Sequence, residues 1–220
     1  MVRRASDGIK LGEYMQKHIW GPLDMTSITF HLEERPDVEA RLSDMSIRTP
    51  TGDLAFIPGH LIEDPVRDDL GGGGSYSSAP DYLKVLASIL RNDGQLLQTQ
   101  TVHEMFKPQL SPQAKEMFQK VLTTPEVNDG MTGGVKIGTS VNWGLGGFLV
   151  EEDTDGGRRK GSLAWVGMPN LYWWVDRETD ICALYATQVV PPGDTKTLNF
   201  VHAFEREMTK RAAGMSKGKI

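Results

Sequence analysis

The residues best suited to chemistry lie in the segment Trp165-Val166-Gly167-Met168-Pro169. Gly167 has no side chain to hold a ligand away from the backbone of a strand. Pro169 has no N–H, so the backbone donors at this point are those of Gly167 and Met168. One of these amides could hydrogen-bond an oxyanion, with Trp165 lining the site. The alternative interpretation is a core aromatic at a strand end followed by a turn glycine.

Other reactive side chains form no comparable pattern. Cys182 lies in an apolar run, where a buried thiol acts as a small hydrophobic residue. The glycines at 71–74 lack the Lys-Ser/Thr pair that follows a phosphate-binding loop. No metal site or cofactor is predicted, because metal-ligand spacing is absent from the five histidines, His18, His31, His60, His103 and His202.

Two short serine motifs match catalytic patterns by letter only. Ser216-Lys217-Gly218-Lys219 fits Ser-x-x-Lys, but that chemistry needs the serine at the buried start of a helix, which a Lys/Gly tail does not provide. Ser140-Val141-Asn142 fits Ser-x-Asn without the surrounding helix pair, and such triplets arise often by chance. Neither is predicted to supply a nucleophile.

Composition indicates an ordinary globular chain. Its 220 residues are 39% hydrophobic and 24% charged, which suits a single domain or a large part of one. The formal charge of −5, without a dense basic face, argues against nucleic acid and anionic membrane as partners. No apolar stretch follows Arg3 and Arg4, and Cys182 is the only cysteine, so we expect a cytoplasmic protein without a disulfide.

The first part of the chain, residues 9–142, is predicted to be mainly helical with one long loop. Apolar spacing predicts a helix from Leu11 to Trp20, and residues 31–70 should form a long excursion with short strands at most. Three further helices are expected in series. The first has Ser77/Ser78 as cap pair and Gly94 as C-terminal cap, the second is capped by Thr99, and the third opens at Ser111-Pro112.

The remaining part, residues 143–213, is predicted to be an antiparallel meander closed by a helix. The strand candidates are residues 143–150, 162–166, 171–176 and 181–187. Asp194 should cap the last helix, and residues 210–220 should form a solvated tail. The expected fold class is α+β, with helices packed on an antiparallel sheet.

Several segments, taken in order, resemble the serine β-lactamase-related family. They include residues 11–25, residues 73–82 and Trp143-Gly144-Leu145-Gly146. The segments 165–170 and 186–193 are most similar to the class C β-lactamase-like esterase and acyltransferase branch, which includes fungal polyketide-pathway acyltransferases. The resemblance implies an incomplete β-lactamase/transpeptidase-like fold, with residues 1–220 as its C-terminal part.

The resemblance also implies roles for the opening segment. Trp165-Val166-Gly167 matches the third family motif and would bind substrate, while Met168 would give the second oxyanion N–H. Tryptophan in place of the lysine of penicillin-recognising members favours a neutral ester or thioester. The Ser-x-x-Lys and Tyr-x-Asn motifs would precede the segment matching Leu11, so nucleophile and base are absent from this chain.

Three hypotheses remain open. In the first, the chain is the C-terminal part of a serine esterase or acyltransferase and is inactive alone. In the second, it is a non-catalytic ligand-binding or interaction module of the same fold. In the third, it assembles with a missing N-terminal segment, because a sheet lacking its first strands leaves an open edge.

Overall fold

The computed structural model describes residues 1–217 of the chain. The structure contains eight α-helices within that range, one π-helical segment and one 3₁₀ turn. The α-helices are α1 Val2–Ala5, α2 Leu11–Met15, α3 Pro36–Glu39, α4 Ala79–Arg91, α5 Thr99–Met105, α6 Pro112–Val121, α7 Pro125–Thr132 and α8 Thr195–Lys217. The π-helical segment is Gln16–Trp20 and the 3₁₀ turn is Leu32–Glu34.

The strands of the described residues form three sheets. The largest is antiparallel with the order β5-β6-β7-β8-β9, and the others have the orders β10-β2-β3 and β1-β4. The bounds are β1 Ile28–Thr29, β2 Met45–Arg48, β3 Leu54–Ile57, β4 Tyr76–Ser77, β5 Val141–Trp143, β6 Phe148–Val150, β7 Leu163–Gly167, β8 Leu171–Asp176, β9 Ile181–Tyr185 and β10 Val189–Val190.

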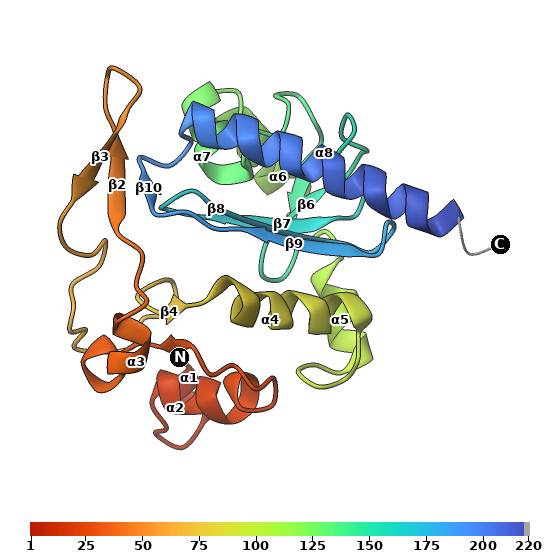
Figure 1. Cartoon of the computed structure of the whole chain (residues 1–220). Coiled ribbons are helices and arrows are strands. Elements are labelled where there is room, and N and C mark those ends of the chain that lie inside the picture. Colours follow the sequence, from red (N-terminus) through yellow and green to blue (C-terminus); the bar gives the residue numbers. More distant parts are fainter. Residues whose placement is uncertain (218–220) are drawn as a thin grey trace.

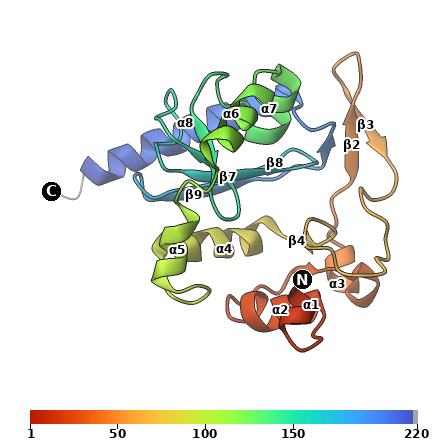
Figure 2. The same ribbon diagram turned by 180° about the vertical axis from the view of Figure 1, so that it is seen from behind.

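Helices cover both faces of the five-stranded sheet. Helix α8 lies across one face, and α4 with α5 lies against the other (Figures 1 and 2). The face toward α4 buries Leu86, Ile89 and Val102 against Val175, while the α8 face buries Leu198 and Val201 against the sheet. The predicted α+β class and antiparallel sheet are thus confirmed. No helix within residues 1–217 has the length and apolar character needed to span a membrane.

Helix α4 forms where its sequence signals agree. Ser78 accepts a hydrogen bond from Asp81 N at 3.3 Å, which confirms the N-terminal cap. The C-terminal prediction was wrong, because the left-handed cap residue is Asn92 (φ 49°) and not Gly94. Asparagine reaches this conformation at little cost, so the helix ends two residues earlier.

Helices α5 and α6 form where they were predicted, but the cap of α5 differs from the prediction. Ser111 caps α6 as predicted, accepting from Ala114 N at 3.2 Å. Thr99 does not cap α5, because it is already the first helical residue and Gln98 holds the cap position. Helix α7 was not predicted. Its sequence contains Gly130 and ends at Thr132, both poor helix formers, and only Pro125 at its start indicates a helix.

The structure also corrects two predictions in the second part of the chain. Residues 143–150 are not one strand, because a tight turn at 144–147 separates β5 from β6. The final helix does not give way to a solvated tail at residue 210, since α8 continues to Lys217. Residues 218–220, and therefore Lys219 of the Ser-x-x-Lys match, lie outside the described residues.

The small sheet joins distant parts of the chain. Strands β2 and β3 form an antiparallel hairpin inside the predicted excursion, in keeping with short strands there. Strand β10 pairs with β2 in parallel, with Val189 opposite Ser46, and Ser46 N donates to Gln188 O at 2.8 Å. This parallel pair was not predicted, because two-residue strands carry no periodic signal.

Asp194 fixes the start of α8 to this small sheet. Its carboxylate accepts from Thr197 N at 3.0 Å and from the Thr197 hydroxyl at 2.7 Å, which confirms the predicted cap. The same carboxylate accepts two bonds from the Arg48 guanidinium, at 2.9 and 3.0 Å. These hydrogen bonds, those from Arg48 above all, hold the pKa of Asp194 well below its ordinary value.

The Asp194 carboxylate should make stability depend on acid pH. A depressed pKa in the folded state adds stability that is complete above the unfolded pKa of about 4 and is lost as the pH falls. We expect Asp194→Asn, which keeps a capping oxygen, to cost on the order of 1–3 kcal/mol at neutral pH and progressively less toward acid pH. Urea unfolding from pH 7 down to pH ~3 measures this. A cost that does not change with pH would contradict it.

Candidate active site

The candidate site lies at the end of strand β7, where β6 no longer pairs with it. Strand β6 pairs with β7 at Leu163 and Ala164. Strand β8, on the other side, pairs with β7 along its whole length to Gly167. The second half of β7, from Trp165 to Gly167, therefore has an open edge toward β6 although β7 is central in the sheet order.

The Met168 amide points toward this open edge. Alternate residues of a strand direct their N–H and C=O groups to the same side. Ser162 O accepts from Val150 N at 3.1 Å, so residues of the same parity, including Val166 and Met168, face the β6 side. Within residues 1–217 the Met168 N–H has no hydrogen-bond partner, and the residue is 61% exposed.

Trp165 lies opposite Trp173 in the register, and its side chain packs against the buried cluster that contains Phe148, Ala164 and Trp174. The Trp165 ring also meets Trp143 edge to face, with centroids 4.7 Å apart. The two rings form a half-buried aromatic wall beside the open edge of β7.

Val166 and Gly167 contribute backbone rather than side chains. The Val166 side chain lies opposite Tyr172 and packs toward Leu198 and Val201 of α8. A Cβ at Gly167 would lie 3.0 Å from Leu171 Cδ1, so packing against β8 also favours glycine there. Trp165 and Met168 thus both lie at the end of β7 that β6 does not cover, while the Val166 side chain packs toward α8.

The turn between β5 and β6 borders the site. Gly144 N donates to Gly147 O at 2.8 Å, and Leu145 N donates to Met105 O at 3.1 Å. A Cβ at Gly144 would collide with the Met105 carbonyl, and one at Gly147 would lie 2.5 Å from the Ala164 carbonyl of β7. The glycines therefore allow this turn to pack directly on backbone.

Gly147→Ala tests this close approach. We expect a loss of about 1–3 kcal/mol in the free energy of unfolding. The new Cβ would collide with the Ala164 carbonyl oxygen, which belongs to the backbone, so the backbone of the turn or of β7 must shift. Gly130→Ala is the matched control. It lies inside α7 with nothing within 4 Å of a new Cβ, and alanine there should be neutral or stabilise by up to about 1 kcal/mol. Urea unfolding of the two variants measures the difference, and equal effects would contradict the proposed packing.

The Ser140-x-Asn142 triplet belongs to a structural network. Ser140 Oγ donates to Glu151 at 2.7 Å and Asn142 Nδ2 donates to the same carboxylate at 3.1 Å. Lys115 pairs with Glu151 at 2.5 Å, and Asn142 Oδ1 accepts from Leu110 N at 3.2 Å. These bonds tie β5 to β6 and to the start of α6.

The side chain that sequence reasoning missed is Asn170, at the end of the turn after Met168. It is fully buried and left-handed (φ 56°). Its Oδ1 accepts from the Tyr172 hydroxyl at 2.7 Å, from Gly193 N at 2.9 Å and from Asp194 N at 3.2 Å. Its Nδ2 donates to Val189 O and Pro191 O at 2.7 and 2.8 Å. The only local signal is an asparagine after proline in a hairpin turn.

Comparison with curated proteins gives related acyltransferases and esterases. The chain is 38% identical over 209 residues to monacolin J acid methylbutanoyltransferase of Aspergillus terreus, covering 93% of this chain and 50% of that protein. It is 35% identical over 196 residues to lovastatin esterase of Penicillium rubens, covering 88% and 49%. The chain spans about half the length of the curated relatives it matches.

Solved structures agree with this relation. A mutant of simvastatin synthase from Aspergillus terreus superposes with a TM-score of 0.91 at 35% identity, over 97% of this chain and 54% of that one. EstCE1, a hydrolase with promiscuous acyltransferase activity, has a TM-score of 0.61 at 16% identity over 88% and 49%, which shows the fold alone. The predicted resemblance to fungal polyketide-pathway acyltransferases is confirmed.

The family profile described as beta-lactamase matches residues 1–206, nearly the whole chain. Acyl transfer or ester cleavage by a serine enzyme is the chemistry of this group at family level. The chain belongs to the beta-lactamase family.

Proposed function

We propose that residues 1–220 are the C-terminal portion of a serine esterase or acyltransferase that acts on ester or thioester substrates. The observation that carries this is the open half-edge of β7, which contains Trp165 and ends at a Met168 N–H that no group within residues 1–217 accepts. Such an amide, fixed before reaction, stabilises the charge that develops on a substrate carbonyl oxygen.

The proposed reaction runs through an acyl-enzyme. A serine outside this chain attacks the substrate carbonyl, and the Met168 N–H donates to the resulting oxyanion. The ester or thioester bond then breaks, and the alkoxide or thiolate leaves with the proton taken from the serine. Water or an acceptor alcohol next attacks the acyl-enzyme, so hydrolysis and transfer share one intermediate. A single oxyanion donor of this kind is worth about 10²–10³ in rate.

Substrate class follows from the residues beside the Met168 amide. Trp165 and Trp143 offer an apolar wall and no cation for a carboxylate. Val166 and Gly167 would contribute backbone groups rather than side chains. The relatives named for methylbutanoyl transfer and for lovastatin cleavage support neutral ester or thioester substrates.

Labelling with an active-site probe tests this assignment. The purified chain is incubated with a fluorophosphonate, which reacts with activated serines, and in parallel with p-nitrophenyl butyrate. We expect neither stoichiometric labelling nor turnover, because no serine in the described part of the chain holds the Ser-x-x-Lys arrangement. Stoichiometric labelling together with turnover would show that the chain carries its own nucleophile.

A binding module without catalysis is the second candidate, favoured by the presence of the aromatic wall in a chain whose described residues hold no serine in a catalytic Ser-x-x-Lys arrangement. Methyl butyrate serves as the ligand, and isothermal titration calorimetry measures its affinity. Saturable binding that is lost in Trp165→Ala but not in Met117→Ala, an exposed residue of α6, would favour this candidate. Absence of binding would count against it.

A partner segment is the third part of the proposal. Strand β9 has no neighbour on its outer side among the described strands. Phe200 of α8, 60% exposed, and Tyr185 of β9 lie next to each other, with centroids 5.4 Å apart, beside this edge. An open edge with adjacent exposed aromatic surface suits an added strand. Chromatography of the chain with and without the remaining half of a relative measures assembly.

A further inference from the structure

We propose that Asn170 is a positioning residue that fixes the Met168 amide through the segment 189–194. This inference rests on the proposed function, because it assigns a cause to the orientation of the oxyanion donor. Asn170 is two residues from Met168 in the same hairpin turn and makes five hydrogen bonds through one side chain.

The turn is held from both of its ends. Gly167 pairs with Leu171 at the close of the β7-β8 ladder, which fixes the chain before Met168. After Met168, the Thr187 hydroxyl donates to Pro169 O at 2.6 Å. Asn170 then anchors the end of the turn to Val189 and Pro191. The exposed Met168 amide lies between fixed points, although it makes no hydrogen bond itself within the described chain.

The segment 189–194 is itself bonded to the rest of the fold. The segment 189–194 begins in β10, which pairs with β2, and ends at Asp194, which is bonded to Arg48 and caps α8. Asn170 Oδ1 accepts from the N–H groups of Gly193 and Asp194, so the turn is connected to the start of α8. Supporting bonds of this kind keep a catalytic donor in its productive direction.

Side chain and backbone roles of Asn170 can be separated. Asn170→Gly keeps the left-handed backbone at no steric cost and removes all five bonds. Asn170→Asp keeps the acceptors and loses the two donors to Val189 O and Pro191 O. Asp180 is the matched control, because it is a left-handed residue (φ 57°) in the next hairpin turn and is exposed. Tyr172→Phe removes a single bond to Asn170 and serves if the stronger variants do not fold.

Nuclear magnetic resonance of the full chain labelled with ¹⁵N-methionine gives the readout. In the wild-type chain we expect the Met168 amide to have an order parameter near 0.85, as in rigid backbone. In Asn170→Gly it should fall below about 0.6, with a smaller decrease in Asn170→Asp and in Tyr172→Phe and none in Asp180→Gly. An unchanged Met168 order parameter in both Asn170 variants, even with a lower melting temperature, would overturn the proposal.

A second measurement separates this inference from the proposed function. The monomethyl ester of butylphosphonate, an anionic tetrahedral mimic, is titrated into the wild-type chain and Asn170→Gly. A shift of the Met168 resonance in the wild type, lost in the variant, supports both. A Met168 amide that loosens in Asn170→Gly but never responds to the phosphonate would support the positioning role and overturn the oxyanion assignment.

Discussion

Joining this chain to a segment that carries a Ser-x-x-Lys nucleophile is expected to raise its ester turnover by about six decades. The physical reason is that the proposed function gives the Met168 amide charge stabilisation and the aromatic wall substrate binding, but the covalent step needs a serine oxygen. The part of the Aspergillus terreus relative outside the matched region is fused ahead of Met1. Hydrolysis of p-nitrophenyl butyrate and fluorophosphonate stoichiometry are then measured for the fusion and for the chain alone.

The control for this gain lies in the added segment. Changing its Ser-x-x-Lys serine to alanine should return turnover and labelling to the level of the chain alone, since the fold of the fusion is kept. A folded fusion with an intact serine that gains no activity would contradict the proposed function. The same fusion allows Trp165→Lys to be tested, which should disfavour neutral esters because a cation replaces the apolar wall.

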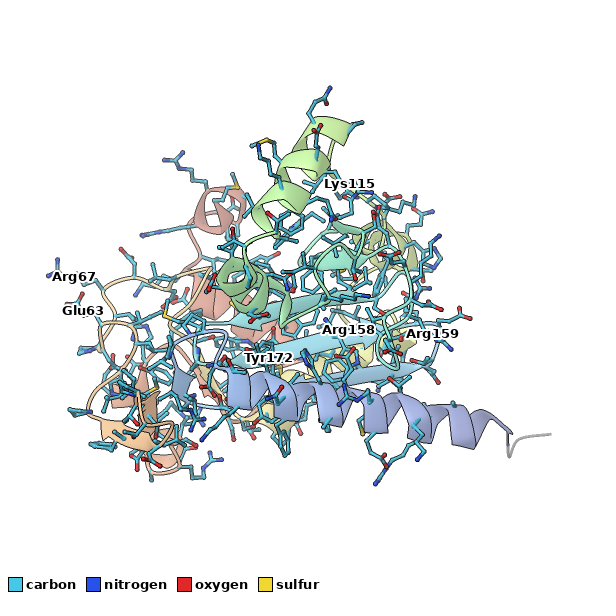
Figure 3. The ribbon with its side chains drawn as sticks, turned by 90° about the horizontal axis from the view of Figure 1, so that it is seen from above. Glu63, Arg67, Lys115, Arg158, Arg159 and Tyr172 are labelled. Carbon is cyan, nitrogen blue, oxygen red and sulfur yellow. The ribbon has the colours of Figure 1, made fainter. Side chains whose placement is uncertain are left out.

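Replacing Arg158 by leucine is expected to lower the free energy of unfolding by about 3–5 kcal/mol. Arg158 lies buried between the sheet and α8 (Figure 3), and its guanidinium donates to Glu205 at 2.8 and 3.2 Å. It is also 5.8 Å from the ring centroid of Phe148 and 5.9 Å from that of Trp174. Burial works to raise the pKa of Glu205, but the charge and hydrogen bonds of Arg158 leave it lowered. Leucine at 158 would leave the buried Glu205 carboxylate without its charged partner and without water.

Two further variants show whether the lost stability comes from the unpaired charge. Arg158→Leu combined with Glu205→Leu should recover much of the loss, because apolar pairs often replace buried ion pairs at little cost. Arg211→Leu is the matched control on α8. Arg211 bonds Glu207 at 2.8 Å with both side chains exposed, and its removal should change stability by less than about 0.5 kcal/mol. A loss at Arg158 no larger than at Arg211 would contradict the prediction, and urea unfolding measures all three variants.

Local signals were sufficient for part of the fold. The apolar stripe after Ser78 and the proline after Ser111 lie within one helix each, and both helices form as predicted. Helix α7 was not predicted because Gly130 and Thr132 weaken its intrinsic helix propensity. Packing in the folded chain, and not a periodic apolar pattern, stabilises such a short helix. The parallel pairing of β10 with β2 depends on residues far apart in sequence, so no local pattern indicates it.

The candidate site could be predicted only in outline. The segment 165–169 was identified from Gly167, Pro169 and the family resemblance, and in the structure Trp165 and Met168 lie at the end of β7 that β6 does not cover. Which face Val166 takes depends on the register with β8, which the sequence does not state. Asn170 was missed because its five partners come from residue 172 and from the segment 189–194, brought near only by the fold.

The pairing of β2 with β10 has a consequence for synthesis on the ribosome. Residues 46 and 189 are direct partners, and a chain grows at roughly 5–20 residues per second. The hairpin of β2 and β3 must therefore wait about seven to thirty seconds before its third strand is made. During that interval the edge of β2 is unpaired, next to Leu54 and Phe56 of β3, which stay exposed even in the complete fold, and this surface is available to other nascent chains. Chaperone dependence in the cell should thus be concentrated on residues 45–57.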